Sequence, residues 1–400
     1  MKLGFIFNKQ FREEKVLGWA SVGLLFFVTG FLWAPSRDGL QVVFAIGFLL
    51  PLLTLVPFRR PNFHDYGGWF TCLALIYAAY AALTSFWGIE SNPGFFIAQW
   101  LVLAIWLTGI NLLAVHRLID WDFLFRSLLI LGSLISIIIF ISFYGQYPLS
   151  TRLEGLLVAR NPNEVGALFG ILSLLAFCQW LKAKSRCENA EWVLILFCLI
   201  VPLILSQSRG AIFALGVTSL TAMFYLGISR LKLVLVLTVM ILLTLLMLYQ
   251  YYYAELTPDR LTAGFRDVIW QEVFARSIHE HLWWGIGLDK DSRIIIPDVD
   301  VFNHAHNAWL DTFYRTGLVG LVLALAHLFY VLQKFKSTDK LVPLYLWLMF
   351  GLIVTIFDYR IFFWQIDFKW FLFWVPVGLI SAAQLQESRM KENSGDKNGS

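Results

Sequence analysis

Hydrophobic runs of about twenty residues follow one another along almost the whole chain. A run of this length can cross a bilayer as an α-helix, because a helix rises about 1.5 Å per residue and the hydrocarbon layer is about 30 Å thick. A β-barrel would instead show alternating segments of about ten residues. The sequence therefore predicts an all-α polytopic membrane protein with about twelve transmembrane helices. The runs lie at roughly 16–34, 40–57, 67–87, 94–114, 123–143, 163–181, 191–206, 210–228, 232–250, 307–332, 341–357 and 367–385.

The composition of the 400-residue chain agrees with this class. Hydrophobic residues make up 58% of it and charged residues 14%, which is more apolar side chain than a water-soluble domain of this size can bury. The net charge of +4 is spread over many loops and gives no signal for nucleic-acid binding. Three of the four cysteines lie inside hydrophobic runs, so no disulfide framework is predicted.

Lysine and arginine concentrate in alternate loops. One set of loops carries most of them, from Lys2 near the start to Lys391 near the end, whereas the loop at 88–93 carries none. By the positive-inside rule the basic set faces the cytoplasm. We therefore expect both termini in the cytoplasm of a bacterial inner membrane protein, with nine spans in 1–250, a long periplasmic loop at 251–306, three spans in 307–385 and a disordered cytoplasmic tail at 386–400.

The long loop is predicted to contain an amphipathic helix within 264–287. Apolar side chains recur there at four-residue spacing, and Thr257 with Pro258 upstream are residue types that begin helices. We expect this helix to lie at or in the membrane interface. Its two apolar rows are Phe265, Ile269, Val273 and Trp270, Phe274, Ile278.

Ionisable residues crowd the start of the tenth span, in "HAHNAWLDTFYR". Asn307, Asp311 and Arg315 follow one another at four-residue steps, which places them on one helical face. Asp311 and Arg315 can neutralise each other and so reduce the cost of charge near hydrocarbon, which makes a purely structural ion pair one interpretation. That interpretation explains His306 less well, because its imidazole precedes the pair and faces outward. His304 stands beside it as a residue that could orient His306 or replace it.

Three arginines and an asparagine lie on other outer segments. Arg209 occupies a very short turn, Arg160 and Asn161 precede a Pro-Asn helix start, and Arg266 belongs to the amphipathic helix. Each alone has an ordinary explanation as a snorkelling, helix-starting or solvated residue. Together they bring guanidinium groups to the level of His306, and guanidinium binds phosphate oxygens bidentately. This combination suits a phosphate-linked lipid substrate and a hydroxyl or amine acceptor, with a neutral histidine as general base.

Other patterns could bind metal ions. His-x-His occurs at 279–281 and 304–306, and Asp-x-Asp at 120–122, 289–291 and 298–300. Such pairs are common by chance, and no soluble α/β domain accompanies the acidic ones. We therefore favour a site without metal or cofactor and keep a histidine metal site as the alternative.

Four segments resemble signatures of the bacterial O-antigen ligase and O-antigen polymerase family. "HNAWLDTFYRTGLVG" is similar to its His-Asn, nine residues, Gly-x-x-Gly motif, with His306 and Asn307 leading to Gly317 and Gly320. "SQSRGAIFAL" and "LEGLLVARNPNEVGAL" resemble its Ser-Arg-Gly and Asn-Pro-Asn segments. "RDVIWQEVFARSIHEHLWWGIGLD" resembles a further stretch, although His-Leu-Trp at 281–283 stands where the family often has proline. The resemblance covers roughly 150–325.

This resemblance implies a metal-independent, inverting glycosyltransferase of the GT-C type, with a glycan on undecaprenyl diphosphate as donor. His306 would be the general base, and Arg209, Arg266 and Arg160 would hold the diphosphate. The ligase reaction has lipid A–core as its acceptor. A polymerase extending the glycan and an oligosaccharyltransferase acting on a protein such as pilin stay open. A transporter of the same lipids is less favoured, because few ionisable residues lie in the middle of the predicted spans.

Overall fold

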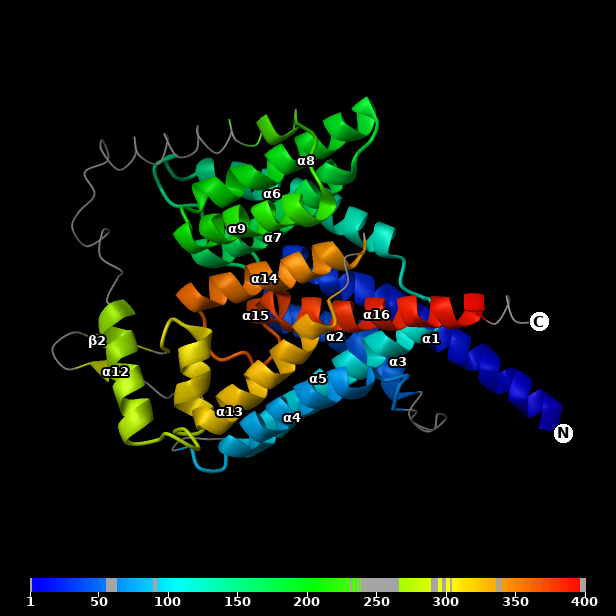
Figure 1. Cartoon of the computed structure of the whole chain (residues 1–400), viewed down its shortest axis with the longest axis horizontal. Helices are drawn as coiled ribbons and strands as arrows, with labels where there is room; N and C mark the ends of the chain where they lie inside the picture. Colours follow the sequence, from blue (N-terminus) through cyan, green and yellow to red (C-terminus); the bar gives the residue numbers. More distant parts are fainter. Residues whose placement is uncertain are drawn as a thin grey trace.

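The computed structural model describes residues 2–54, 63–88, 92–230, 266–288, 304–335 and 340–395, together with 232–234, 236, 238, 294–296, 300–302 and 338. These residues form a bundle of α-helices with one short antiparallel hairpin (Figure 1). The elements are α1 (Lys2–Trp33), α2 (Arg37–Phe44), the π-helix η1 (Ala45–Leu49), α3 (Leu50–Leu53), α4 (Gly68–Thr84), α5 (Pro93–Val115), α6 (Trp121–Tyr144), α7 (Pro162–Lys182), α8 (Arg186–Leu205), α9 (Arg209–Leu226), α12 (Arg266–His279), β1 (Ile294–Ile296), β2 (Asp300–Phe302), α13 (Ala308–Gln333), α14 (Leu341–Phe357), α15 (Phe368–Leu372) and α16 (Trp374–Gly395).

The helices confirm the predicted class of all-α polytopic membrane protein. In the described part of the chain, 8 helices are long and apolar enough to cross a membrane, and α4 and α14 are shorter apolar helices. The predicted run at 40–57 consists of α2, η1 and α3, and the last run is divided between α15 and α16. Most of the run at 232–250 lies outside the described residues.

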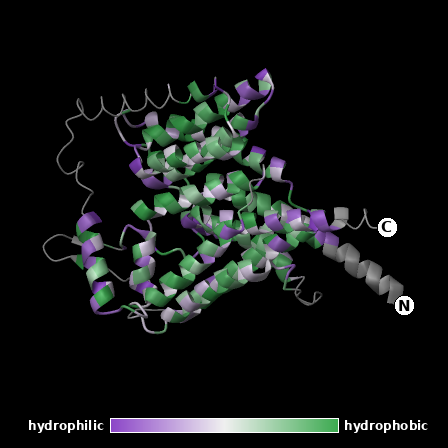
Figure 2. Cartoon of the chain, in the orientation of Figure 1, coloured by the Kyte–Doolittle hydropathy of each residue, from purple (hydrophilic) through white to green (hydrophobic). Residues whose placement is uncertain are grey.

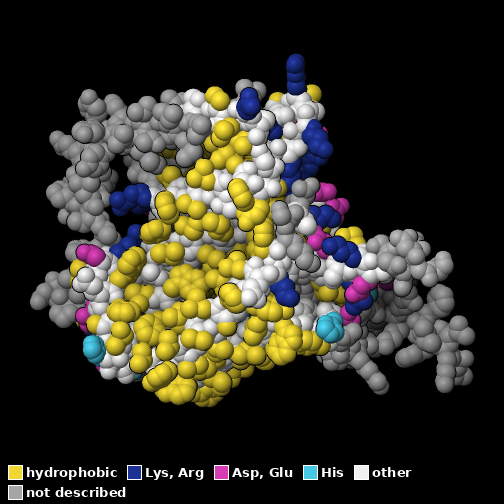
Figure 3. Space-filling view, viewed as in Figure 1, with side chains coloured by type: hydrophobic (Ala, Val, Ile, Leu, Met, Phe, Trp, Pro, Cys, Tyr) yellow, Lys and Arg dark blue, Asp and Glu magenta, His cyan; other side chains and the backbone are white. Residues whose placement is uncertain are grey.

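The bundle has two hydrophilic ends and a mainly hydrophobic middle. Helix α1 begins and α16 ends at one of them, which we call the terminal end, and α12 lies at the other, the α12 end (Figure 1). Hydrophilic residues concentrate towards both ends, and the helices between them are mainly hydrophobic (Figure 2). Hydrophobic side chains also cover much of the outer surface between the ends (Figure 3). An apolar surface of this extent matches a lipid environment.

Helix α7 forms the centre of one half of the bundle. It packs against α8, α9 and α14. In its apolar stretch of 18 residues 89% is buried, compared with 17% in the corresponding stretch of α8. Phe169 and Leu172 on α7 are fully buried, whereas Leu194 and Phe197 on α8 are about two-thirds exposed. Because α7 is held on several sides, the residues at its first turn have fixed positions at the α12 end.

Helix starts at the α12 end are capped by side chains. Asn161 caps α7 in a reciprocal capping box with Glu164, and Pro162 takes the first helical position. Asn307 caps α13, and its Oδ1 accepts hydrogen bonds from the N–H groups of Trp309 and Leu310 at 3.0 and 3.1 Å. Both asparagines predicted as supporting site residues therefore have local structural roles.

Helix α13 is interrupted at Gly317, whose backbone has φ 66° and ψ −171°. A continuous helix would pair the carbonyls of residues 314 and 315 with the N–H groups of 318 and 319. Here those carbonyls accept from Ile286 and Gly287, and the N–H groups of Leu318 and Val319 donate to the carbonyls of residues 282 and 283, at distances of 2.8–3.3 Å. Segment 282–287 thus satisfies the backbone groups that the break exposes.

Two glycines make this joint possible. Gly285 and Gly317 both have positive φ values, 68° and 66°. A Cβ at Gly285 would overlap the backbone of Arg315, and one at Gly317 would overlap the carbonyl of Trp283. We call segment 282–287 together with residues 314–319 of α13 the clasp. Gly285 and Gly317 belong to two separate Gly-containing motifs, and the clasp gives both the same structural reason, a positive φ at a close approach of two backbones.

Helix α12 is present and packs against α13 through one of its predicted rows. Ile269 and Val273 are fully buried, whereas Phe274 and Ile278 of the other row are 53% and 39% exposed. The helix ends at His279, earlier than the predicted limit of 287, because the chain then turns into the clasp. Phe265, Thr257 and Pro258 lie outside the described residues.

The predicted disordered tail is corrected in part. Helix α16 continues through residues 386–395 and ends at Gly395. Gln386 is buried, and its side-chain oxygen accepts a hydrogen bond from Trp121 at 2.6 Å, while Arg389 pairs with Asp65. These contacts hold polar residues in a helical conformation that their composition alone does not indicate.

Candidate active site

A histidine and a carboxylate meet at the α12 end of the bundle. His306 Nδ1 lies 3.0 Å from Asp358 Oδ1, where Asp358 follows the last residue of α14. Asp358 also accepts hydrogen bonds from Asn163 at 2.9 Å and from the backbone N–H of Tyr359 at 2.8 Å. Burial opposes ionisation of this carboxyl, but the bonds from His306, Tyr359 and Asn163 outweigh burial and hold its pKa well below the usual range.

This pair sets the tautomer of His306. An ionised carboxylate only accepts, so Nδ1 carries the proton and Nε2 keeps its lone pair. His306 and Tyr359 both have positive φ values, 49° and 79°, which non-glycine residues rarely adopt. Backbone strain of this kind collects at functional sites, where surrounding contacts enforce it.

His304 lies directly against His306. Its Nδ1 accepts the backbone N–H of His306 at 3.0 Å, and the two ring centroids are 4.1 Å apart. Burial, followed by the nearby His306, lowers the pKa of His304 to about 3, so this imidazole is neutral near pH 7. Its contact with the backbone helps to hold His306 in its left-handed conformation.

Asp311 and Arg315 form a buried ion pair behind the two histidines. The distance from Arg315 Nε to Asp311 Oδ2 is 2.9 Å, and both side chains are at most 1% exposed. Asp311 also accepts the N–H groups of Ala305, at 3.4 Å, and Ile361, at 2.9 Å. The pair therefore fixes both loops that carry the site, and removal of one partner would leave a buried charge at a cost of about 3–5 kcal/mol.

Helix α12 also holds the histidine loop. The indole N–H of Trp270 donates to the carbonyl of Ala305 at 3.0 Å. Ala305 is thus bound from α12 through its carbonyl and from Asp311 through its N–H. The helix that begins with Arg266 is in this way connected directly to the segment that carries His306.

One cavity beside Asp358 is rich in arginine. It has a volume of about 130 Å³, and we call it the arginine cavity. Arg209 and Arg266 line it as predicted, and Arg152 joins them. Arg209 is the first residue of α9, so unpaired helical N–H groups add to the positive potential. Three guanidinium groups beside a helix start suit a phosphate or diphosphate group.

Arg160 lies elsewhere. It lines a second, larger cavity of about 540 Å³ that also borders Asp358, which we call the mixed-charge cavity. The predicted set of three diphosphate-binding arginines is therefore divided between two cavities. Asp358 is the residue that both share. The mixed-charge cavity is lined by Ser36, Arg37, Asp38, Val158, Arg160, Asn161, Glu164, His304, Asp358, Tyr359, Arg360, Asp367, Phe368 and Lys369.

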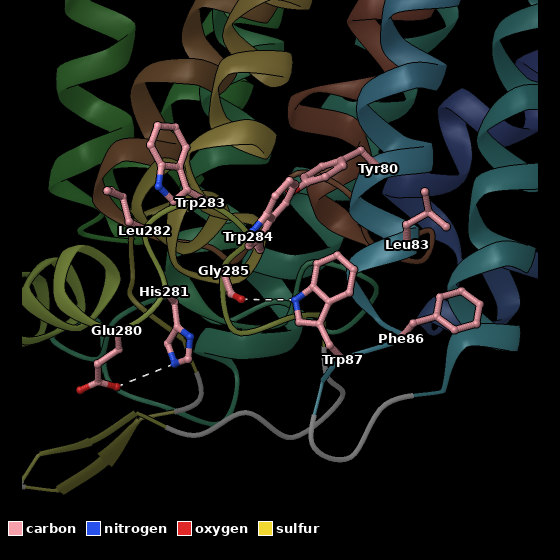
Figure 4. Close-up of a pocket in the computed structure, with 10 residues that line it drawn as sticks. All are labelled: Tyr80, Leu83, Phe86, Trp87, Glu280, His281, Leu282, Trp283, Trp284 and Gly285. Carbon is pink, nitrogen blue, oxygen red and sulfur yellow. Dashed lines mark hydrogen bonds and ion pairs between the residues drawn. The ribbon is translucent and has the colours of Figure 1, made fainter.

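A third cavity, of about 700 Å³, lies beside the clasp and is mainly apolar. Trp283 and Trp284 line it from the clasp, Phe86 and Trp87 line it from the residues after α4, and the indole N–H of Trp87 donates to the carbonyl of Gly285 at 3.3 Å (Figure 4). None of its lining residues is an arginine or a lysine. This cavity therefore lacks the groups that bind phosphate, in contrast to the arginine cavity.

His304, His306 and Asp358 are close enough to be considered as metal ligands, since one ligand atom from each lies within 4.8 Å of the others. The Nδ1 atoms of both histidines are already used in hydrogen bonds within the protein. The remaining ring nitrogen, Nε2, is the atom through which either imidazole could bind an ion. Of the other predicted metal patterns, those at 289–291 and 298–300 lie wholly or largely outside the described residues.

Asp358 and Arg152 are the site residues to which sequence analysis assigned no role. Asp358 lies in a charged outer turn with Arg360, and Arg152 in the polar stretch before α7. The available signal was their presence on the same predicted side of the membrane as His306. Nothing in their local sequence shows that Asp358 would meet His306.

Fold and site together define a multi-pass membrane protein with a polar, arginine-rich site at one end of its helices. A family model described as O-antigen ligase matches residues 194–325, which include Arg209, Arg266 and His306. Over 395 residues, the chain is 26% identical to a protein named O-antigen ligase from Pseudomonas aeruginosa, covering 95% of this chain and 93% of that relative. No solved structure matches the chain. Both comparisons support similarity of this chain to the O-antigen ligase family.

Proposed function

We propose that this protein transfers polysaccharide from undecaprenyl diphosphate to lipid A–core at the periplasmic face of the bacterial inner membrane. The observation that carries the proposal is the His306–Asp358 pair at the edge of the arginine cavity. A base and a phosphate-binding site next to each other are what a direct displacement at an anomeric carbon needs. The basic loops support a cytoplasmic location for both termini under the positive-inside rule.

In the proposed reaction, His306 Nε2 takes the proton of an acceptor hydroxyl as that oxygen bonds to the anomeric carbon of the donor glycan. The bond from this carbon to the diphosphate oxygen breaks, and the electron pair leaves with undecaprenyl diphosphate. Asp358 stabilises the imidazolium that forms, as a carboxylate bound to the Nδ1 side can. A single displacement inverts the anomeric configuration.

The arginine cavity supplies the charge stabilisation. Arg209, Arg266 and Arg152 would bind the diphosphate and oppose the negative charge that grows on the leaving oxygen. Guanidinium groups can perform this role without a metal ion. Asp311, Arg315 and His304 position the base and have no direct part in the bond changes.

The test is complementation of a strain that lacks its O-antigen ligase, with lipopolysaccharide separated on a gel. Wild type is expected to restore the ladder of long chains, whereas His306→Ala, matched for membrane abundance, leaves bare core. If wild type leaves bare core, lipid A–core is not the acceptor. Strains that lack the polymerase or a pilin glycosyltransferase then separate the two alternatives, which share the donor chemistry.

A further inference from the structure

The mixed-charge cavity has no part in the donor chemistry above, yet two of its lining residues bond to the proposed base. His304 and Asp358 line it, and both bond to His306. Its walls come from the start of α2, the start of α7 and the residues before it, the loop before α13, the turn after α14 and the start of α15. Segments from both halves of the sequence thus enclose a polar space next to His306.

The acidic groups of this wall are largely engaged by the protein. Asp367 pairs with Lys369 at 2.9 Å, and Glu164 accepts the N–H groups of Arg160 and Asn161 in the capping box. Asp358 is bound by His306, Asn163 and Tyr359, as described above. Asp38, in the first turn of α2, is the remaining acid.

Three cations of the wall, by contrast, have no carboxylate partner. Among the described residues, Arg37, Arg160 and Arg360 form no ion pair within 4.0 Å. Arg37 and Arg160 are exposed, and Arg360 is half-buried with its guanidinium 5.6 Å from the Trp364 ring centroid. Burial and then the charge of Arg315 lower the pKa of Arg360; Asp311 and Asp367 oppose this change, and Arg37 adds to it. Two like charges thus act on Arg360, and an anion bound beside it and Arg37 would relieve that repulsion.

The geometry of the displacement reaction indicates whether the donor or the acceptor binds in the mixed-charge cavity. The attacking hydroxyl must approach the anomeric carbon on the side opposite the leaving group. The two cavities share Asp358 and no other lining residue, so a diphosphate in the arginine cavity leaves the mixed-charge cavity as a separate space from which the acceptor can approach. Asp38 and neighbouring polar groups can bind sugar hydroxyls there, and the arginines can bind a phosphate or carboxylate.

We propose that the mixed-charge cavity is the acceptor subsite and that Arg37 and Arg360 recognise an anionic substituent on the acceptor sugar. This inference rests on the proposed function, because it takes the arginine cavity as the donor site. The proposal divides the recognition of anionic groups between the arginine cavity and the mixed-charge cavity. Arg209 and Arg266 act on the donor, whereas Arg37 and Arg360 act on the acceptor.

The experiment measures binding and transfer separately. Purified lipid A–core, and the same material after chemical removal of its phosphates, are titrated onto the purified protein in detergent without donor. Arg37→Ala and Arg360→Gln are each expected to weaken binding of intact lipid A–core by about tenfold to a hundredfold, the usual effect of losing a charge-assisted hydrogen bond. Dephosphorylation should weaken wild-type binding similarly and affect the two variants little.

The matched control is Arg126→Ala. Arg126 is an exposed arginine on α6 that lines none of the three cavities, and it pairs with Glu191 at 2.8 Å. In transfer assays, Arg37→Ala and Arg360→Gln should raise KM for the acceptor and leave KM for the donor within about twofold of wild type. If intact and dephosphorylated acceptor bind wild type equally but a carboxyl-reduced acceptor binds poorly, the anion is a carboxylate and the subsite stands.

The subsite is overturned if both variants bind acceptor as Arg126→Ala does, or if they raise KM for donor and acceptor together. Failure of the proposed function has a different signature, which is absence of transfer to lipid A–core by wild type. The binding titration needs no transfer. It therefore decides the inference in either case.

Discussion

His306 and Asp358 are 52 positions apart in the sequence, and their side chains are joined at 3.0 Å. One precedes α13 and the other follows α14, so both belong to loops at the same end of an antiparallel helix pair. The ion pair of Asp311 with Arg315 holds both loops through Ala305 and Ile361. The orientation of His306 therefore depends on contacts between the two loops as well as on the sequence around it.

Asp358→Asn is expected to reduce transfer by about 10²–10⁴-fold, because an amide cannot stabilise imidazolium and can reverse the tautomer of His306. The measurement is the initial rate of glycan transfer in membranes with equal amounts of protein. Asp122→Asn, at an exposed acid in the first turn of α6, is the control and should retain full activity. Unchanged activity of Asp358→Asn would mean that the carboxylate has no role in catalysis.

Arg209→Ala and Arg266→Ala are expected to raise KM for the donor by about tenfold or more and to lower kcat, since both guanidinium groups face the proposed diphosphate. Lysine at either position should restore only part of the activity, because an ammonium does not bind two oxygens in a fixed plane. Arg126→Ala serves as the control here also. Donor kinetics equal to those of this control would remove the arginine cavity from the mechanism.

The stability of the protein towards acid should depend on His304. Its pKa is about 3 in the folded protein and about 6.5 in the unfolded chain, so between these values only the unfolded state binds the proton. Stability from this group is therefore present above pH 6.5 and is lost as pH falls towards 3. His304→Asn keeps an acceptor for the N–H of His306 but cannot titrate, so its melting temperature should fall less than that of wild type between pH 7 and pH 5. An equal fall in both proteins would contradict this.

Gly317→Ala and Gly285→Ala are each expected to destabilise the protein by about 1–3 kcal/mol, because both positions have positive φ and a Cβ would meet backbone across the clasp. Thermal unfolding of purified protein in detergent measures the effect. Gly216→Ala in α9 is the control, since a Cβ there meets nothing within 4 Å. This control should be neutral or slightly stabilising. Three variants of equal stability would show that the joint tolerates side chains.

Chelation should leave transfer unchanged. The proposed charge stabilisation comes from arginines, and His304 and His306 use their Nδ1 atoms within the protein. Transfer by purified enzyme is measured before and after incubation with EDTA and removal of the chelator. Activity that disappears and returns with a divalent cation would instead assign His304, His306 and Asp358 to a metal site.

Local signals were sufficient to predict much of this molecule. The length of the apolar runs predicts most of the helices, and four-residue spacing predicts both α12 and the face that carries Asp311 and Arg315. Asn161 and Asn307 have the sequence context of helix caps and occupy cap positions. These features depend on interactions within a few residues, which a single sequence records.

Contacts between residues far apart in the sequence could not be predicted from these local signals. The contact of Asp358 with His306 depends on how α13 and α14 pack, and Arg160 and Arg209 line two different cavities that share Asp358. The continuation of α16 to Gly395 likewise depends on distant partners, Trp121 and Asp65. Residue type and spacing do not encode these distances directly.

The clasp limits how this enzyme can be recombined with its relatives. Outer loops are usual places for exchanging segments between homologous membrane enzymes, since loops tolerate replacement better than helices. Here a crossover between residues 282 and 319 would combine a loop from one parent with a helix from another and misalign the hydrogen bonds across Gly317. A chimera that exchanges residues 266–319 as one block keeps the joint intact, so the natural unit of exchange is the loop together with the first part of α13.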